Sequence, residues 1–357
     1  MKMKVLHIIT HFDIGGAERV AINIAKSNSK DFEYHIMEVA RAKGTFTKQL
    51  IQECKDDDIK IHRSLIGNSK FAILLFPFIL LFHTIKIHPD IIHSHTEIPD
   101  LSIYLWKKTF GHFFSKIKYI RTIHNTQLWN KWKRIGDKVE NFFKKETTTI
   151  TISTSTRQYY LTEFKIKTPI IYNGIEEIKQ IPFKGIVPNR INILFAGRLE
   201  PQKGVDILIN VIKSLKHDSR FIFHVVGVGS MADKVNELCD FDNVRLYNKI
   251  YGLSSYLASF DYLFMPSVHE GLALMPIEAS FAKVPTIINR CPGLKDTLPE
   301  DWVLAIDNND IDKLILLFNN LENMHREELG IKAYNFALEN FTIQKMQKEY
   351  ESIYLNA

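Results

Sequence analysis

The sequence predicts an α/β protein of two doubly wound domains, each a parallel sheet with helices on both faces. Short apolar, β-branched runs alternate with helical stretches along the 357 residues, and this alternation is typical of parallel sheets. The length suits two domains, since one usually takes roughly 100–200 residues. Residues 173–190 are rich in Gly, Pro and charge without a periodic apolar face, which is typical of a linker. We therefore expect a first domain over residues 1–175 and a second from residue 190.

The expected elements follow one another in a regular order. Strands of the first domain are expected over residues 5–9, 36–39, 59–62, 91–95, 117–123, 149–153 and 169–172. Helices fill the gaps, for example over residues 17–27, 45–55 and 101–109. The second domain repeats the plan with strands over residues 191–196, 221–226, 244–246, 262–265, 286–288 and 303–306, and ends in a helical stretch over 311–355.

One apolar run, residues 71–82, invites a membrane interpretation. It has twelve apolar residues including Pro77, whereas a membrane-spanning helix needs about 20. We therefore expect a buried core helix, with an interfacial membrane helix as the alternative. Residues 1–10 are too short an apolar run for a secretory signal and are better interpreted as the first strand.

Composition bounds the class of protein. The chain has 46 Lys+Arg, 40 Asp+Glu and 45% hydrophobic residues, which excludes collagen-like and disordered chains. Its three cysteines, Cys54, Cys239 and Cys291, are far apart and form no C-x-x-C pair. A disulfide framework or structural zinc site is therefore not expected, and a reducing cytoplasm is the natural compartment.

Charge is divided unevenly between the two halves. Residues 1–180 hold 28 Lys/Arg and 18 Asp/Glu, whereas residues 181–357 hold 18 and 22. Within residues 106–145 there are eleven Lys/Arg, two acids and nine aromatic residues. Such a stretch suits an anionic lipid surface or a nucleic acid, or it is a solvated basic face above ordinary core aromatics. A nucleic-acid module leaves the second domain unexplained, so we expect no nucleic-acid partner.

Ligands of parallel α/β sheets bind at the carboxyl ends of strands, so the loops that follow strands are the candidate sites. Gly15 and Gly16 lie between the first strand and a helix, where backbone amides and the helix dipole favour an anion. The loop is neither a G-x-G-x-x-G motif nor a P-loop, which argues against nicotinamide and ATP. A plain tight turn is the alternative.

Three further loops carry chemistry. Arg198 and Lys203, flanked by Gly197 and Gly204, could converge on one diphosphate. Glu270 and Glu278 lie eight residues apart at the start of a helix, so both can face one ligand, and carboxylates suit sugar hydroxyls. His124 closes a strand of the first domain, although a single histidine is often structural.

These motifs occur in a recognisable order. They are Gly15-Gly16-Ala17-Glu18, Thr122-Ile123-His124-Asn125, Ile171-Tyr172-Asn173-Gly174-Ile175, Gly197-Arg198-Leu199-Glu200-Pro201-Gln202-Lys203-Gly204, and Glu270-Gly271-Leu272 with Glu278. Over nearly the whole chain they resemble glycosyltransferase family 4. The resemblance implies a GT-B fold, in which two Rossmann-like domains face a cleft. It also implies a second domain over residues 190–335 and a C-terminal helix, residues 336–357, that packs back on the first domain.

The resemblance further implies a role for each matched residue. Arg198 and Lys203 would hold the diphosphate of a nucleotide sugar, helped by the backbone of Gly15 and Gly16. His124 would lie near the reacting face of the sugar, which Glu270 would grip. The remaining substrate-binding positions are Glu278 for the ribose, the amides of Gly271, Leu272 and Ala273 for the sugar, Gly227 and Gly229 beside the nucleotide, Lys249 and Ile250 at the base, and Asn173 and Gly197.

Physical chemistry favours the same assignment. Breaking a sugar–phosphate bond builds negative charge on the diphosphate, which two cations and a helix N-terminus can offset without Mg²⁺. No D-x-D pair is placed to hold a metal, and the run from Asp56 to Asp58 is expected to be solvated. No carboxylate is stationed as a nucleophile for double displacement. The resemblance implies retention of the anomeric configuration without a bound metal, and with no such nucleophile we expect it to occur by same-face attack, with no cofactor and with the nucleotide sugar as the donor substrate.

The acceptor is expected on the more basic first domain. The resemblance implies a lipid-linked saccharide in bacterial surface polysaccharide synthesis, reached from the cytoplasm by peripheral attachment to the inner face of the plasma membrane. UDP is expected as the nucleotide because it is frequent in the family. The alternative is a catalytically inactive GT-B subunit that acts as a membrane- or partner-binding scaffold.

Overall fold

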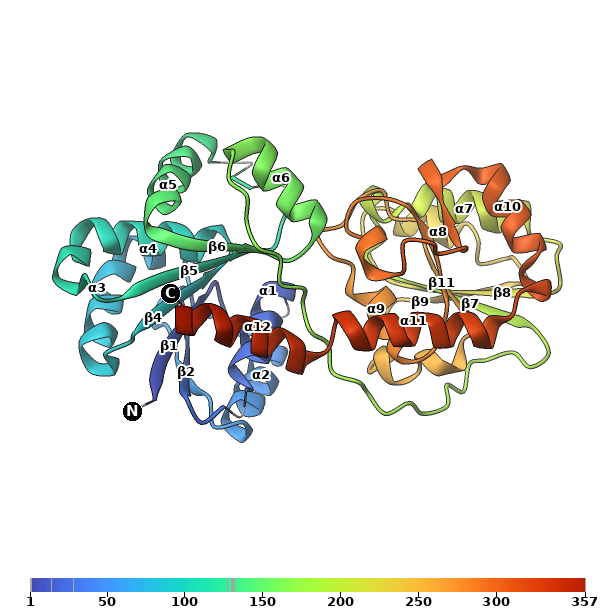
Figure 1. The fold of residues 1–357 in the computed structure, drawn as a ribbon. Helices are drawn as coiled ribbons and strands as arrows, with labels where there is room; N and C mark the ends of the chain where they lie inside the picture. Colours follow the sequence, from blue (N-terminus) through green and yellow to red (C-terminus); the bar gives the residue numbers. More distant parts are fainter. Residues whose placement is uncertain (1, 14, 28, 127, 130–131, 357) are drawn as a thin grey trace. The chain divides into compact units, whose positions relative to one another are not determined.

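The computed structural model describes residues 2–13, 15–27, 29–126, 128–129 and 132–356. The chain forms two compact units, residues 1–174 with 343–357, and residues 175–342. Each is an α/β domain with a six-stranded parallel sheet (Figure 1), so the predicted fold class is confirmed. The divisions after Gly174 and Thr342 differ from the expected boundaries. Ile175 forms a parallel bridge with Thr342, which ties the start of the expected linker to the second domain.

The first sheet has the strand order β3-β2-β1-β4-β5-β6. Its strands are β1 (Met3–Ile9), β2 (Phe32–Glu38), β3 (Lys60–His62), β4 (Ile91–His95), β5 (Lys118–Ile123) and β6 (Thr147–Thr151). Its helices are α1 (Gly16–Ala25), α2 (Thr45–Asp56), α3 (Ser69–Ile87), α4 (Glu97–Thr109), α5 (Lys133–Glu146), α6 (Thr154–Phe164) and α12 (Ile343–Asn356). The expected strand over residues 169–172 is wrong: it makes only an isolated bridge, from Ile170 to Thr151.

Each face of the first sheet has its own core, because alternate side chains of a strand point to opposite faces. One core contains Leu6 and Ile8 of β1 with side chains of α3, α4 and α5. The other contains Val5 and Ile9 with side chains of α1, α2 and α12. Helix α12 therefore packs on the first domain although it ends the chain, and it contacts α1 (Figure 1).

The second sheet has the order β12-β11-β10-β7-β8-β9. Its strands are β7 (Ile191–Ala196), β8 (Phe221–Val226), β9 (Val244–Tyr247), β10 (Tyr262–Met265), β11 (Thr286–Asn289) and β12 (Ala305–Ile306). Its helices are α7 (Val205–Ser214), α8 (Ala232–Asn236), α9 (Leu274–Phe281), α10 (Ile311–Asn319) and α11 (Arg326–Asn340). Both sheets thus repeat one order, in which the first strand lies between the second and the fourth.

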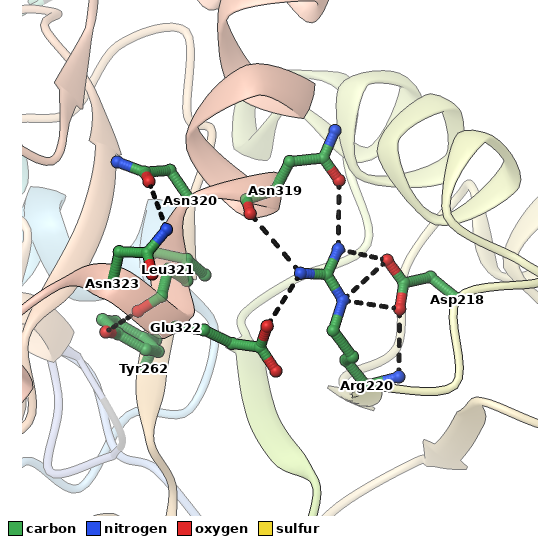
Figure 2. Close-up of polar contacts among 8 residues, drawn as sticks. All are labelled: Asp218, Arg220, Tyr262, Asn319, Asn320, Leu321, Glu322 and Asn323. Atoms are coloured by element: carbon green, nitrogen blue, oxygen red, sulfur yellow. Dashed lines mark hydrogen bonds and ion pairs between the residues drawn. The ribbon is translucent and has the colours of Figure 1, made fainter.

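A polar cluster fastens α10 beside the start of β8 (Figure 2). The guanidinium of Arg220 donates to Asp218 at 2.6 Å and to Glu322 at 3.1 Å. It also donates to the backbone carbonyl of Asn319 at 3.4 Å, the last residue of α10. A cation there complements the negative end of the helix dipole, so we assign this cluster a structural role.

Helix α3 differs from the expected buried helix. It runs through Ser69–Ile87, and by length and composition it could cross a membrane. Only 39% of its most apolar window is buried, whereas a core helix would be mostly buried. Six large apolar side chains on it are exposed, namely Phe71, Leu74, Leu75, Phe78, Phe82 and Ile85. Their spacing of three or four residues places them on one face. The expectation of a core helix is therefore wrong for that face.

The basic aromatic stretch over residues 106–145 also differs from the simplest expectation. Trp106, Trp129 and Phe143 are at most 5% exposed and belong to the core of the first domain. Residues 127, 130 and 131 of the stretch lie outside the described residues. Four of its nine aromatics are therefore buried and unavailable to a surface ligand, whereas Phe113 and Trp132 are 72% and 39% exposed.

A buried ionic cluster joins three elements of the first domain. Arg121 of β5 donates to both oxygens of Glu140 at 2.8 and 2.9 Å and pairs with Asp100 at 2.9 Å. Trp129 and Tyr160 also donate to Glu140. Burial raises the pKa of Asp100 to about 7, which reduces the excess negative charge of two acids around one cation.

Candidate active site

Both sheets have a switch point where the strand order reverses, between β1 and β4 and between β7 and β10. Ligands of open parallel sheets bind at the carboxyl ends of strands at such points. The loops that follow β7 and β10 contain Arg198, Lys203 and Glu270, and the loop that follows β1 contains Gly15 and Gly16. The predicted site residues therefore gather where the fold favours a ligand.

The structure brings Lys203 and Glu270 together. Lys203 Nζ lies 2.6 Å from Glu270 Oε1, and their side chains are 18% and 9% exposed. Two contacts hold their loops side by side: the amide of Val268 donates to the carbonyl of Gln202 at 2.8 Å, and the Gln202 side chain donates to the carbonyl of His269 at 3.0 Å. The residue predicted to hold the diphosphate, Lys203, thus forms an ion pair with the residue predicted to hold the sugar, Glu270.

Arg198 lies in the same loop but stays exposed. Within the described residues it has no ion-pair partner, so its charge is available to a ligand. The loop around it is held by Glu200, which accepts hydrogen bonds from the amide of Ser230 at 3.0 Å and from its hydroxyl at 2.6 Å. The arrangement offers one anchored and one accessible cation.

Gly197, Gly227 and Gly229 let two backbone segments approach closely. The amide of Gly197 donates to the carbonyl of Val226 at 3.0 Å. A Cβ atom on Gly227 would lie 2.0 Å from the carbonyl oxygen of Gly197, and one on Gly229 would lie 2.4 Å from that of Leu199. Gly227 and Gly229 are therefore required by the fold of the loops, whether or not they also border a nucleotide, whereas a Cβ atom on Gly197 would meet only the Lys203 side chain at 3.8 Å.

Glu278 sits in α9 with few polar partners. It accepts a hydrogen bond from the Ser254 hydroxyl at 2.7 Å, and burial raises the pKa of its carboxyl. Lys249 is exposed, with its ammonium 4.6 Å from the centroid of the Tyr251 ring, and Ile250 packs against the domain core. Their contacts with a ribose and a base stay predictions.

The segment before α9 contains one departure from the predicted contacts. The amide of Ala273 donates to the carbonyl of Gly293 at 3.1 Å, so it is already paired within the protein, and the contacts of Gly271, Leu272 and Ala273 with a sugar stay predictions. The amide of Glu270 likewise donates to the carbonyl of Pro292 at 2.9 Å. Sequence reasoning missed this supporting loop, although Pro292-Gly293 shortly after an expected strand was a signal for it.

The loop after β1 shows a second departure. Helix α1 begins at Gly16, and a Cβ atom on Gly15 would lie 2.0 Å from the carboxyl of Glu18. Burial raises the pKa of that carboxyl. The protein's own acid thus lies at the helix end that was expected to receive a phosphate. A Cβ atom on Gly16 would meet nothing within 4 Å, so open space remains beside that residue.

His124 and Asn173 complete the predicted set. His124 Nε2 lies 3.3 Å from His95 Nδ1, and burial lowers the pKa of His124 to about 3. Asn173 is buried, and its side-chain oxygen has no hydrogen-bond partner within the described part of the chain. A buried unpaired acceptor is unusual and suits a ligand that brings a donor.

Three histidines are arranged so that they could hold a metal ion. Nitrogens of His7, His93 and His95 lie within 4.8 Å of one another. Both nitrogens of His93 are already engaged, by the hydroxyls of Tyr354 at 2.8 Å and Thr122 at 2.9 Å. A metal would have to displace these bonds, so the contacts favour a hydrogen-bonded network.

Comparison with known proteins identifies the family. The family described as Glycosyltransferase Family 4 matches residues 14–177, and that described as Glycosyl transferases group 1 matches residues 190–321. An uncharacterised glycosyltransferase of Methanocaldococcus jannaschii is 30% identical over 287 residues, which cover 74% of this chain and 76% of that protein. The chain belongs to glycosyltransferase family 4.

This glycosyltransferase is also similar to the O-antigen biosynthesis glycosyltransferase WclY of Escherichia coli, with 26% identity over 297 residues, 75% of this chain and 79% of that one. Among solved structures, Anabaena HepE in complex with UDP-glucose has a TM-score of 0.76 at 16% identity, over 99% of this chain and 100% of that one. The expected GT-B fold is therefore confirmed.

A cavity of about 740 Å³ in the first domain lies apart from the predicted site residues of this glycosyltransferase. It is lined by side chains of α5 and α6 and by Leu128 and Trp129. None of the residues predicted to bind the donor lines it, so we assign it no role in donor binding.

Proposed function

We propose that this glycosyltransferase transfers a sugar from a UDP-sugar to a lipid-linked saccharide, with retention of the anomeric configuration and without a metal ion. The observation that carries the proposal is the Lys203–Glu270 ion pair beside the exposed Arg198, at the switch point of the second sheet. The site places positive charge for a leaving diphosphate directly beside a carboxylate that can accept hydrogen bonds from sugar hydroxyls.

The donor replaces part of that ion pair. When a diphosphate approaches Lys203, the ammonium exchanges its carboxylate partner for phosphate oxygens, and Glu270 becomes an acceptor for sugar hydroxyls. Arg198 supplies the second charge and can bind phosphate through two N–H groups. Removing a single such group commonly lowers kcat by roughly 10²–10³-fold. Glu278 accepts the ribose hydroxyls in the same pocket.

The proposed retention proceeds by attack on the same face of the sugar. The acceptor oxygen forms a bond to the anomeric carbon on the face from which the sugar–phosphate bond breaks, and the acceptor proton passes to an oxygen of the departing diphosphate. The two cations offset the charge that develops there. This route uses no cofactor and no metal, and Asp56, Asp57 and Asp58 are exposed at the end of α2. EDTA should leave the rate unchanged.

The relatives support the donor and the pathway. HepE was solved with UDP-glucose, which supports UDP over GDP, and WclY acts in O-antigen biosynthesis, which supports a surface polysaccharide. Acceptors of such pathways are carried on membrane lipids. We place the enzyme in the reducing cytoplasm, at the inner face of the plasma membrane, which is compatible with three unpaired cysteines.

Helix α3 supplies the main membrane contact in this proposal, because four of the nine aromatics of residues 106–145 are buried. Its exposed apolar face would enter the interfacial region of an anionic bilayer. Lys70 and Lys86 on the helix and Lys108 and Lys116 from the neighbouring segment are exposed, and each basic residue near an anionic surface contributes about 1 kcal/mol. Phe78 also packs on Phe110, 5.5 Å between centroids, which ties α3 to that segment.

Donor turnover tests the proposed function. The purified protein is incubated with UDP-, GDP- and ADP-sugars, and nucleotide release and thermal stabilisation are measured with and without acceptor. We expect stabilisation by one UDP-sugar, since ligand at 100 times its dissociation constant adds about 2.7 kcal/mol. Glu270→Gln and Arg198→Ala should lose turnover, whereas Lys213→Ala, an exposed lysine of α7, should not.

The same assay separates an enzyme from an inactive scaffold. Equal nucleotide release by the wild type and the Arg198→Ala and Glu270→Gln variants would overturn the site assignment. Binding to liposomes without donor turnover by any nucleotide sugar would favour the scaffold alternative.

A further inference from the structure

A chain of imidazoles runs through the first domain and ends at His124. His7 Nδ1 lies 3.0 Å from His95 Nε2, and His95 Nδ1 lies 3.3 Å from His124 Nε2. His7 comes from β1, His95 from the end of β4, and His124 follows β5. The three side chains thus form two successive hydrogen bonds across neighbouring strands.

Helix α12 covers this part of the sheet. Tyr354 stacks edge-on to His7, 6.4 Å between ring centroids, and its hydroxyl bonds His93. The hydroxyl of Tyr350 bonds that of Thr122 at 2.9 Å. His7 and His95 are fully buried, so water cannot supply the hydrogen bonds that the chain lacks.

The two ends of the chain differ. At the inner end, His7 Nε2 is buried and has no hydrogen-bond partner within the described ranges. At the outer end, His124 is only partly buried and its Nδ1 faces away from the contact with His95. His7 Nε2 limits where the protons can lie because it has no hydrogen-bond partner. His124 is the end of the chain of imidazoles that is open to a ligand.

All three imidazoles are neutral at pH 7. Burial lowers the pKa of His7 and His124 to about 3, and that of His95 well below its usual value. A neutral imidazole has one N–H donor and one acceptor nitrogen. Two hydrogen bonds among three neutral rings therefore allow only two proton arrangements, in which every donor points toward His124 or every donor points toward His7.

The inner end distinguishes the two arrangements. If the donors pointed toward His7, its Nε2 would carry a proton in the core without an acceptor, and orphaned buried N–H groups are rare. If they point toward His124, His7 Nε2 keeps only a lone pair, and each N–H of His7 and His95 finds an acceptor. His124 then accepts at Nε2 and carries its proton at Nδ1.

We propose that His7 and His95 are positioning residues, which hold His124 as the Nδ1–H tautomer and so present a hydrogen-bond donor, and not an acceptor, to the bound substrate. Only the identity of that substrate rests on the proposed function. The donor suits an oxygen of the sugar near the reacting carbon. His124 in this state cannot accept the acceptor's proton at Nδ1, which is consistent with transfer of that proton to the leaving diphosphate in the proposed function.

Nuclear magnetic resonance of ¹⁵N-histidine-labelled protein without ligand tests the proposal directly. The expected result is a proton on Nδ1 of His7, His95 and His124, with the His124 signals assigned from their loss in His124→Asn. In His95→Leu, which removes both hydrogen bonds, His124 should become a mixture of tautomers. His95→Asn keeps a donor near the position of Nδ1 and should restore the Nδ1–H state of His124, and it covers the case in which His95→Leu fails to fold.

His93 offers a matched control. It is equally buried and its ring packs 4.2 Å from that of His95, but its hydrogen bonds go to Tyr354 and Thr122 and not to the other imidazoles. His93→Asn should leave the tautomer of His124 unchanged. His95→Leu should lower kcat by about 10- to 100-fold, the range for residues that orient a functional group, with a smaller change in KM, and His95→Asn should recover most of it.

Two results would overturn the proposal: a proton on Nε2 of His124 in the wild type, or a stoichiometric metal ion bound by His7, His93 and His95 in the purified protein. Because the spectra need no substrate, they separate this proposal from the proposed function. If the protein shows the expected tautomers but turns over no nucleotide sugar, the proposed function is refuted and the proposal for the three imidazoles still holds.

Discussion

Lys203 Nζ lies 2.6 Å from Glu270 Oε1 across the switch point of the second sheet. The two residues are 67 positions apart in the chain, and loops after different strands carry them. Before a ligand binds, Lys203 neutralises the charge of the mostly buried Glu270 carboxylate. The pair also holds side by side the two charges that a sugar diphosphate would contact.

The pair predicts that activity and stability can be separated. Lys203→Met should lower kcat by roughly 10²–10³-fold and also destabilise the second domain, because it leaves Glu270 mostly buried without a counter-charge. Adding Glu270→Gln should restore stability but not activity. Urea unfolding and nucleotide release measure the two effects, with the exposed Lys213→Met as control. A double variant no more stable than Lys203→Met would contradict the coupling.

Gly16 allows a test of ligand approach, because a Cβ atom there meets nothing within 4 Å. Gly16→Ala should leave the melting temperature unchanged or higher, since alanine favours helices by up to about 1 kcal/mol over glycine, yet raise KM for the donor about 10-fold if the diphosphate reaches this backbone. Gly67→Ala, whose nearest atom would be 3.9 Å away, is the matched control. Unchanged KM in Gly16→Ala would remove Gly16 from the site.

The buried histidines predict acid sensitivity. Burial lowers the pKa of His7 and His124 to about 3, so between about pH 6.5 and pH 3 the unfolded chain binds more protons than the native one. The free energy of unfolding must then fall as pH falls, by about 1 kcal/mol per such histidine from pH 7 to 5.5. Urea titrations at both pH values should show a smaller loss in His7→Asn, and the same loss as wild type in the exposed His112→Asn.

The ionic cluster around Arg121 predicts a large cost for losing one acid. Glu140→Gln removes one of the two acids paired with a fully buried guanidinium, and breaking a buried ion pair costs about 3–5 kcal/mol. Unfolding followed by tryptophan fluorescence reports it. The exposed Glu163→Gln on α6 should cost less than about 0.5 kcal/mol; a similar loss in both variants would refute the special role of the cluster.

Helix α3 predicts salt-sensitive membrane binding. Leu74 and Phe78 are 66% and 60% exposed, so Leu74→Glu with Phe78→Glu should weaken sedimentation with anionic liposomes without unfolding the protein. High salt should weaken binding of the wild type, since charge attraction is screened. Ile331→Glu, an exposed apolar site in the second domain, serves as control. Liposome binding that is independent of lipid charge and salt, and unchanged in the α3 variant, would contradict the proposal.

Local signals in the sequence predicted most of the fold. The alternation of β-branched runs and helices identified both doubly wound domains, because strand and helix periodicity depends on neighbours in the chain. The strand expected at residues 169–172 failed, although its run is apolar, because a strand also needs a partner along its length and Ile170 has a single bridge. Helix α3 was found but its burial was wrong, since composition does not say which face meets the core.

The candidate site divides in the same way. Motif order and the resemblance to a family selected Arg198, Lys203, Glu270 and Glu278 as candidate site residues, and their roles stay predictions. They did not predict that Lys203 and Glu270 pair, or that the amide of Ala273 is taken by Gly293. Those contacts join loops that are distant in the chain, and only the packed sheet sets the distances between them.

The sequence by itself determined two parallel α/β domains, the family and the loops that are candidates for the site. Only the tertiary structure decided that Trp106 is buried while α3 exposes an apolar face, and that His7, His95 and His124 form one hydrogen-bonded chain under α12. The physical reason is that secondary structure follows from near neighbours, whereas burial, ion pairs and shared protons depend on residues that meet only after the strands align.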